Sequence, residues 1–239
     1  MEARGVIFDL DGTLLDNMAL HAEAFAIFMT RHGLSRPDES QCQGGSGGTG
    51  ESPQLDQRGR IHSARAHAGK RNRDIFPVLF GRALADDELR RFADEKEGLY
   101  RDLSRGRLVA LAGLDRLHAR SIPVAVATSA PPENVRHTLA ELGLDARLDR
   151  VVRADEVPRG KPHPDVFLAA ARLLGVPAAA CVAFEDSPAG VAAAKAAGMT
   201  CVGVTTSFPA SALAAAAAPD FTVADFDEYL KGPGAWLTV

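Results

Sequence analysis

Residues 6–17 read VIFDLDGTLLDN and give the first guide to the fold of this chain. An apolar run ends at Asp9, a second acid follows as Asp11, and Gly12 and Thr13 come next. A short apolar run closed by a turn signal is typical of a buried strand. One acid at its end would suit an ordinary turn. Two acids at this spacing instead indicate a functional site at the end of the strand.

The overall composition is that of a soluble globular protein. The chain has 239 residues, of which 46% are apolar and 24% charged, enough for one large domain or two modest ones. A net charge of −4 argues against nucleic-acid or membrane partners. The N-terminus does not resemble a secretory signal, and no stretch reaches the roughly 18 apolar residues of a membrane helix. We therefore expect a cytoplasmic protein, with Cys42, Cys181 and Cys201 as free thiols.

Strand patterns alternate with helical patterns along much of the chain. Strands are expected at residues 4–9, 122–130, 150–156, 180–187 and 200–206. Helices are expected at residues 17–32, 84–104, 132–144, 163–176 and 188–199, and in the alanine run 214–218. This alternation predicts right-handed crossovers and a parallel sheet. The fold class that follows is α/β with a Rossmann-like parallel sheet.

Polar side chains lie at the ends of four expected strands. These residues are Asp9 and Asp11, Thr128 and Ser129, Asp155 and Glu156, and Glu185, Asp186 and Ser187. Lys161 lies in the loop after the third of these strands. Open α/β sheets bind ligands beyond the carboxyl ends of their strands, so these side chains are candidates for one site.

The acids among them suit a divalent cation. Asp9 and Asp11 repel each other when both are ionised. Mg²⁺ commonly binds through one or two carboxylates together with water and substrate phosphate oxygens. Asp186 can complete such a set of ligands, and Glu185 either supports it or binds the metal directly. We therefore expect a Mg²⁺ site here; zinc is disfavoured because the histidines lack zinc-site spacing.

The remaining residues suit a phosphoryl group. Lys161, Thr128 and the backbone amides near Ser129 can surround three phosphoryl oxygens. Phosphoryl transfer needs mainly positioning and charge neutralisation. A carboxylate beside the metal can attack phosphorus and form an aspartyl-phosphate, and a second carboxylate can act as general acid and then general base.

Four motifs in this order resemble the signatures of the haloacid dehalogenase superfamily of phosphohydrolases. They are DLDGT at 9–13, the threonine that ends VAVAT at 124–128, GKP at 160–162 and FEDS at 184–187. The chain is most similar to the β-phosphoglucomutase-like phosphatases, in which a helical cap is inserted after the first motif. The resemblance covers residues 1–35 and 69–239. It implies a Rossmann-like catalytic core at 1–16 and 107–239 and an α-helical cap at 17–106.

The resemblance also implies a role for each core residue. Asp9 would be the nucleophile and a metal ligand. Asp11 would be the general acid/base and would give its backbone carbonyl to the metal. Dehalogenases of the superfamily lack this second aspartate, so Asp11 favours phosphatase chemistry.

The resemblance implies roles for the residues of the other three motifs as well. Thr128 and Lys161 would bind the phosphoryl group, and Ser129 would contribute mainly through its amide. Asp186 would ligate the metal, with Glu185 in support.

Three cap residues are candidates for substrate contacts. His21 matches a histidine at the junction of core and cap, where hydrogen bonding is favoured over catalysis. Lys96 matches a cap lysine that faces the site, although a solvated helix face would also explain it. Asn72 lies in a basic run, with Arg71 and Arg73, that could hold a distal phosphate or a sugar, or could simply be surface.

Three functions fit these observations. The first is Mg²⁺-dependent hydrolysis of a small phosphomonoester, such as a sugar phosphate, by a protein expected to be a monomer. The second is a β-phosphoglucomutase-like phosphomutase. The third is an impaired binder of Mg²⁺ and phosphate, because the glycine-rich residues 36–68 replace an ordered part of the cap. That stretch reads as a disordered insert or as the product of a reading-frame slip.

Overall fold

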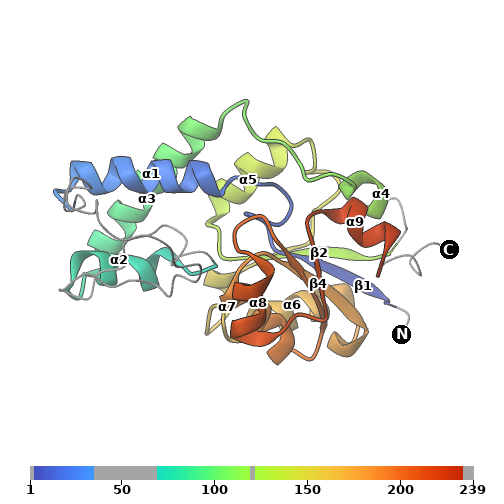
Figure 1. Cartoon of the computed structure of the whole chain (residues 1–239). Helices are drawn as coiled ribbons and strands as arrows, with labels where there is room; N and C mark the ends of the chain where they lie inside the picture. Colours follow the sequence, from blue (N-terminus) through green and yellow to red (C-terminus); the bar gives the residue numbers. More distant parts are fainter. Residues whose placement is uncertain (1–2, 35–68, 119–121, 234–239) are drawn as a thin grey trace, which may run out of the picture. The chain divides into compact units, whose positions relative to one another are not determined.

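The computed structural model describes residues 3–34, 69–118 and 122–233 (Figure 1). Cys42 and the expectations for residues 36–68 lie outside these described residues. The described chain divides into two compact units. The α/β unit comprises residues 3–18, 69–71, 104–118 and 122–233, and the helical unit comprises residues 19–34 and 72–103.

One parallel sheet forms the centre of the α/β unit. Its strands are β1 (Gly5–Phe8), β2 (Val124–Thr128), β3 (Val151–Arg153), β4 (Cys181–Glu185), β5 (Thr200–Val204) and β6 (Phe221–Val223). Their order is β3-β2-β1-β4-β5-β6, and every neighbouring pair is parallel. In the sheet Val6 lies opposite both Val124 and Val182. The carboxyl ends of β1, β2 and β4 are therefore side by side.

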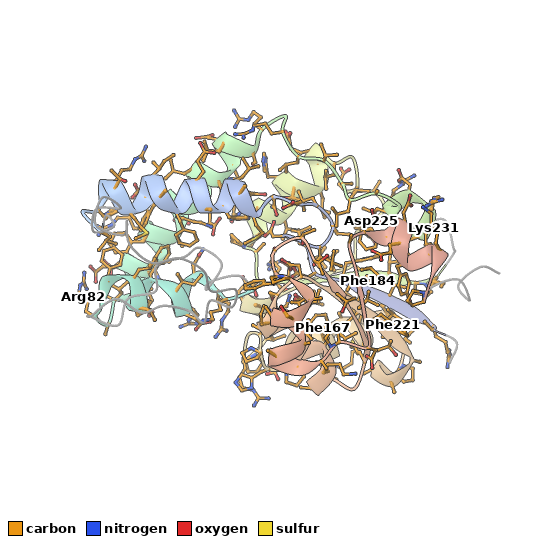
Figure 2. All side chains as sticks on the ribbon, in the orientation of Figure 1. Arg82, Phe167, Phe184, Phe221, Asp225 and Lys231 are labelled. Atoms are coloured by element: carbon orange, nitrogen blue, oxygen red, sulfur yellow. The ribbon has the colours of Figure 1, made fainter. Side chains whose placement is uncertain are left out.

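Helices cover both faces of this sheet. One face packs against α4 (Leu114–His118), α5 (Pro132–Glu141) and α9 (Phe226–Lys231). The other face packs against α6 (Asp165–Leu174), α7 (Pro188–Ala196) and α8 (Ala210–Ala217), which lie together in Figure 1. Successive strand residues point to opposite faces. Accordingly Phe8 and Phe184 belong to one buried cluster, and Ile7 and Phe167 belong to the other. Phe184 and Phe167 are labelled in Figure 2.

The helical unit has an apolar core of its own. It contains most of α1 (Met18–Arg31) and α3 (Asp86–Ser104) and all of α2 (Asn72–Phe80). The buried residues of this apolar cluster are Phe25, Phe28, Ile75, Phe76, Leu79 and Phe92. The ring of Phe28 lies 5.2 Å from that of Phe76 and 5.8 Å from that of Phe92, between centroids. Edge-on and tilted aromatic pairs of this kind add to the stabilisation from buried area.

The expected α/β fold with a parallel sheet is confirmed, and the expected strands and helices are all present. Helix α2, strand β6 and helix α9 have weak sequence signals. Helix α2 contains Pro77, whose ring is disfavoured inside a helix. Strand β6 has three residues with Phe221 and Thr222 exposed, and α9 has six residues. The thiols of Cys181 and Cys201 are buried in the core, and within the described residues every helix is too short or too polar to span a lipid bilayer.

The expectation for the third strand is wrong at its end. The strand stops at Arg153, and Ala154–Glu156 form a 3₁₀ turn. The exposed carboxylates of Asp155 and Glu156 form ion pairs with the Arg153 side chain, at 3.1 and 2.8 Å. These two acids therefore serve the local turn and do not join the acids at the other strand ends.

Candidate active site

Three buried carboxylates meet at the ends of β1 and β4. Asp9 directly follows β1, and its backbone N–H donates to the carbonyl of Phe184 on β4 over 3.0 Å. Glu185 is the last residue of β4, and Asp186 follows it. One carboxylate oxygen from each of the three acids lies within 4.8 Å of the others. Parallel pairing of β1 with β4 thus brings together acids that are far apart in the sequence.

Lys161 supplies a buried positive charge to this group. It lies in the loop between β3 and α6, and its side chain has no exposed surface. Its Nζ donates to Asp9 Oδ1 over 2.5 Å and to Glu185 Oε1. Burial alone would lower the pKa of Lys161, but the two carboxylates outweigh it and raise that pKa. The lysine therefore stays protonated.

The acids are held in unfavourable surroundings for ionisation. Burial is the main reason that the pKa of Asp9 rises from 3.8 to about 7; the charges of Glu185 and Asp11 add to this, and Lys161 opposes it. Burial and the same neighbours raise the pKa of Asp186 well above its ordinary value. One lysine does not balance three carboxylates. The donor set of buried oxygens fits a hard divalent cation, which would supply the missing positive charge.

Glu185 is fixed by the start of α7. Its Oε2 accepts hydrogen bonds from the backbone N–H and the hydroxyl of Ser187, both at 3.0 Å. The Ser187 hydroxyl also caps α7 by accepting the N–H of Gly190 over 3.1 Å. A Cβ on Gly190 would lie 1.8 Å from the Glu185 carboxyl carbon. Glycine at this position therefore makes room for the carboxylate against the helix.

The loop after Asp9 is held by an asparagine that the sequence analysis did not single out. Asn17 donates from Nδ2 to Asp11 Oδ1 over 2.7 Å, and its Oδ1 accepts the N–H of Gly12 over 3.0 Å. Asn17 is buried, whereas Asp11 is half-buried. The signal available in the sequence was a polar residue at the end of the first motif, next to an expected helix. Asn17 fixes the direction of the Asp11 carboxylate.

The end of β2 carries the predicted phosphoryl-binding residues. Thr128 is buried, and its Oγ1 accepts the N–H of Ala130 over 3.0 Å. The Ser129 hydroxyl donates to the carbonyl of Gly69 over 2.8 Å. That bond ties the Ser129 hydroxyl to the segment at residues 69–71.

The turn after β5 adds hydroxyls that the sequence analysis also missed. The Ser207 hydroxyl donates to Asp186 Oδ2, and the Thr206 hydroxyl donates to the carbonyl of Gly12. Thr13 donates to the other oxygen of Asp186 over 3.3 Å. The signal for this turn was present, because Thr206 and Ser207 come at the end of a fifth parallel strand.

The three predicted cap residues lie in one network of the helical unit. Lys96 is buried, with Nζ 3.1 Å from His21 Nδ1 and 3.0 Å from Glu97 Oε1, so the alternative of a solvated helix face is wrong. Asn72 donates to the same Glu97 oxygen over 2.7 Å. The His21 ring stacks on Tyr100 with centroids 3.8 Å apart. Burial opposes ionisation of Glu97, but the nearby positive charge of Lys96 lowers its pKa.

The structure thus sorts the predicted site residues into groups. Asp9, Lys161, Glu185 and Asp186 form the buried centre, and Asp11 is close enough for its charge to raise the pKa of Asp9. Thr128 ends β2, the strand next to β1, and Ser129 follows it. His21, Asn72 and Lys96 belong to the helical unit.

Comparison with known proteins agrees with this fold and site. A family model for haloacid dehalogenase-like hydrolases matches residues 3–198, so the chain belongs to this family of hydrolases, as expected. It is 33% identical over 210 residues to validoxylamine A 7'-phosphate phosphatase from Streptomyces hygroscopicus subsp. limoneus, covering 88% of this chain and 89% of that protein. It is 34% identical over 212 residues to hexitol phosphatase A from Escherichia coli, covering 85% of this chain and 84% of that protein.

A solved structure extends the comparison of folds. The β-phosphoglucomutase from Clostridium difficile superposes with a TM-score of 0.74 at 21% identity, over 99% of this chain and 100% of that one. The expected likeness to β-phosphoglucomutase-like proteins is therefore confirmed for the fold.

Proposed function

We propose that this protein is a Mg²⁺-dependent phosphatase that hydrolyses a small phosphomonoester, such as the phosphate of a sugar or polyol, through an aspartyl-phosphate. The observation that carries the proposal is the buried contact of Asp9 with Lys161 beside Glu185 and Asp186. The names of the two phosphatase relatives, one for a hexitol and one for validoxylamine A 7'-phosphate, support this substrate class.

Asp9 and Asp11 divide the chemistry between them. The Asp9 carboxylate attacks phosphorus, and the bond from phosphorus to the substrate oxygen breaks. Asp11, oriented by Asn17, gives its proton to the departing oxygen. The Asp11 carboxylate then takes a proton from water, and the water attacks phosphorus and releases inorganic phosphate from Asp9.

The other core residues bind and orient the phosphoryl group. Lys161 places a fixed positive charge beside Asp9, and Thr128 with the amide of Ser129 contributes hydrogen-bond donors. Asp9, Asp186 and the backbone carbonyl of Asp11 would hold Mg²⁺, supported by Glu185. When bound, Mg²⁺ neutralises charge on the carboxylates and on the phosphoryl oxygens.

The helical unit serves as the cap in this proposal. The boundaries 17–106 for the cap, and 1–16 with 107–239 for the core, stay predictions. His21 and Lys96 take part as a hydrogen-bonded pair, and Asn72 contacts the part of the substrate distant from phosphorus. We further propose that the enzyme acts as a cytoplasmic monomer on a small phosphorylated metabolite, without a nucleic-acid or membrane partner.

Hydrolysis is favoured over phosphomutase chemistry. A mutase would use the same core residues, and the likeness to β-phosphoglucomutase concerns the fold alone. The relatives named above are phosphatases. A mutase would convert one sugar phosphate into another with little release of inorganic phosphate, so analysis of the products separates the two activities.

The test is release of phosphate from an aryl phosphate, with Mg²⁺ and with a chelator. We expect turnover with Mg²⁺, none with chelator, and none from Asp9→Asn. Asp155→Asn is the matched control, because Asp155 is an exposed acid in the turn after β3. Hexitol and sugar phosphates would then be compared as substrates. A folded wild-type protein without Mg²⁺-dependent turnover would contradict the proposal and favour the impaired binder.

A further inference from the structure

The turn after β5 touches the site at two separate places. The Thr206 hydroxyl donates to the carbonyl of Gly12, in the loop after β1. The Ser207 hydroxyl donates to Asp186 Oδ2, at the end of β4. One short turn therefore contacts both the loop that carries Asp11 and a carboxylate of the acid cluster.

The turn is anchored to the edge of the sheet. The backbone N–H of Thr205 donates to the carbonyl of Val223 on β6 over 3.0 Å, and its hydroxyl donates to the same oxygen over 3.3 Å. Ser207 is buried. Because hydrogen bonds to β6 anchor the turn, the hydroxyls of Thr206 and Ser207 have fixed positions.

Gly12 lies where the Asp11 loop, the Asp186 carboxylate and the Ser207 hydroxyl come together. Its φ is +81°, and a Cβ there would lie 2.0 Å from Asp186 Oδ2 and 2.7 Å from Ser207 Oγ. Only glycine allows the Asp11 loop, the Asp186 carboxylate and the Ser207 hydroxyl to come this close. The packing leaves Asp186 little freedom to turn.

The hydrogen bonds still leave Asp186 able to bind a cation. Ser207 donates to one carboxylate oxygen, and Thr13 donates to the other over 3.3 Å. An ionised carboxylate has about four lone-pair sites, so two of them stay available to a metal. Partners of this kind orient metal ligands in many proteins.

We propose that the turn contains two positioning residues with separable effects. Ser207 orients Asp186 for the metal, and Thr206 positions the Asp11 loop for proton transfer. This inference rests on the proposed phosphatase function and gives the turn after β5 a role in that function. Removing the Ser207 hydroxyl should weaken metal binding strongly, whereas removing the Thr206 hydroxyl should slow turnover and weaken metal binding much less.

The test measures Mg²⁺ binding by calorimetry without substrate, and turnover at saturating Mg²⁺. Ser207→Ala should weaken Mg²⁺ binding by about 10- to 100-fold. Thr206→Val should weaken Mg²⁺ binding much less than Ser207→Ala does, since of the proposed ligands it disturbs only the Asp11 carbonyl. Its kcat should fall about tenfold, because misplaced catalytic groups reduce rates. Ser211→Ala, in the exposed first turn of α8, should change neither quantity. Melting in chelator checks that each variant is folded.

Conservative variants complete the design. Ser207→Thr should recover binding because it keeps the hydroxyl. If Ser207→Ala does not fold, Ser207→Cys replaces it, since a thiol is a weak donor of similar size and should also weaken binding.

Two results would overturn the inference. One is a folded Ser207 variant without the hydroxyl that binds Mg²⁺ as tightly as the wild type. The other is a Thr206→Val protein that keeps the wild-type kcat or loses Mg²⁺ binding as severely as Ser207→Ala. Failure of the proposed function is distinguishable, because the wild type and Ser211→Ala would then both lack Mg²⁺-dependent turnover.

Discussion

The ammonium of Lys161 lies 2.5 Å from Oδ1 of Asp9, although 152 positions separate the two residues in the chain. Both side chains are buried, and the lysine also donates to Glu185. A buried ion pair of this kind is costly to desolvate and is a weak argument for stability by itself. Under the proposed function the pair has a catalytic use, because the lysine places positive charge beside Asp9, where a phosphoryl group would bind.

Replacing Lys161 with methionine should disable the site. Loss of the ammonium leaves two buried carboxylates without their partner, which should lower the free energy of unfolding by about 3–5 kcal/mol in chelator. Turnover should fall by roughly 10²- to 10³-fold, as when one electrostatic donor is removed. Phosphate release and thermal melting measure these effects. Lys195→Met, which removes an exposed ion pair with Asp220, is the control and should change little. Near-normal turnover of Lys161→Met would contradict the assigned role.

Metal binding should strengthen as the pH rises toward neutrality. The pKa of Asp9 is raised by burial from 3.8 to about 7. Between these values the folded protein in chelator holds a proton that the unfolded chain has released, so the free energy of unfolding falls as the pH rises. A cation must displace this proton. The increase in melting temperature caused by Mg²⁺ should therefore grow between about pH 6 and about pH 8. If Mg²⁺ raised the melting temperature by the same amount at every pH, a raised pKa of Asp9 would be contradicted.

Two helical glycines offer a matched pair of substitutions. Gly190→Ala places a Cβ 1.8 Å from the Glu185 carboxyl carbon. The clash should destabilise the protein by about 1–3 kcal/mol and weaken Mg²⁺ binding, because Glu185 must move. Gly98→Ala, in α3, meets no atom closer than 3.9 Å and should instead stabilise by about 0.5–1 kcal/mol through helix propensity. Melting curves and calorimetry check both. Equal effects of the two substitutions would be inconsistent with the packing described.

The network in the helical unit should depend on Lys96. Lys96→Met removes a buried positive charge that contacts Glu97 and should destabilise the protein by about 3–5 kcal/mol. Arg82→Met breaks an exposed ion pair with Glu88 and is expected to change the melting temperature little. Because the pKa of Glu97 is lowered, the stability that it contributes should be present above its ordinary pKa of 4.5 and be lost as the pH falls below it. If Lys96→Met melts like Arg82→Met, Lys96 is not the partner that keeps Glu97 charged.

The fold was predictable where the local pattern carried the information. Alternating strand and helix signals identified the parallel sheet, and Asp9, Lys161, Glu185 and Asp186 were recognisable from motifs near strand ends. Asp155 and Glu156 had the same signal, yet they pair with Arg153 in an exposed turn. A strand end with acids is therefore an incomplete guide, because the pattern does not show where the strand stops.

The amino-acid sequence by itself determined the family, the sheet and the residue types of the site, since these depend on short-range patterns and ordered motifs. Only the tertiary structure decided which hydroxyls and amides hold those residues. Asn17 on Asp11, Ser207 on Asp186 and Gly190 beneath Glu185 are contacts that depend on side-chain direction and on close approach of backbones. The Ser207 contact forms because β4 and β5 are neighbours in the sheet. Asn17 and Gly190 lie close in sequence to Asp11 and Glu185, but their contacts depend on how the loop and the helix start are turned, and the residue pattern does not specify that geometry.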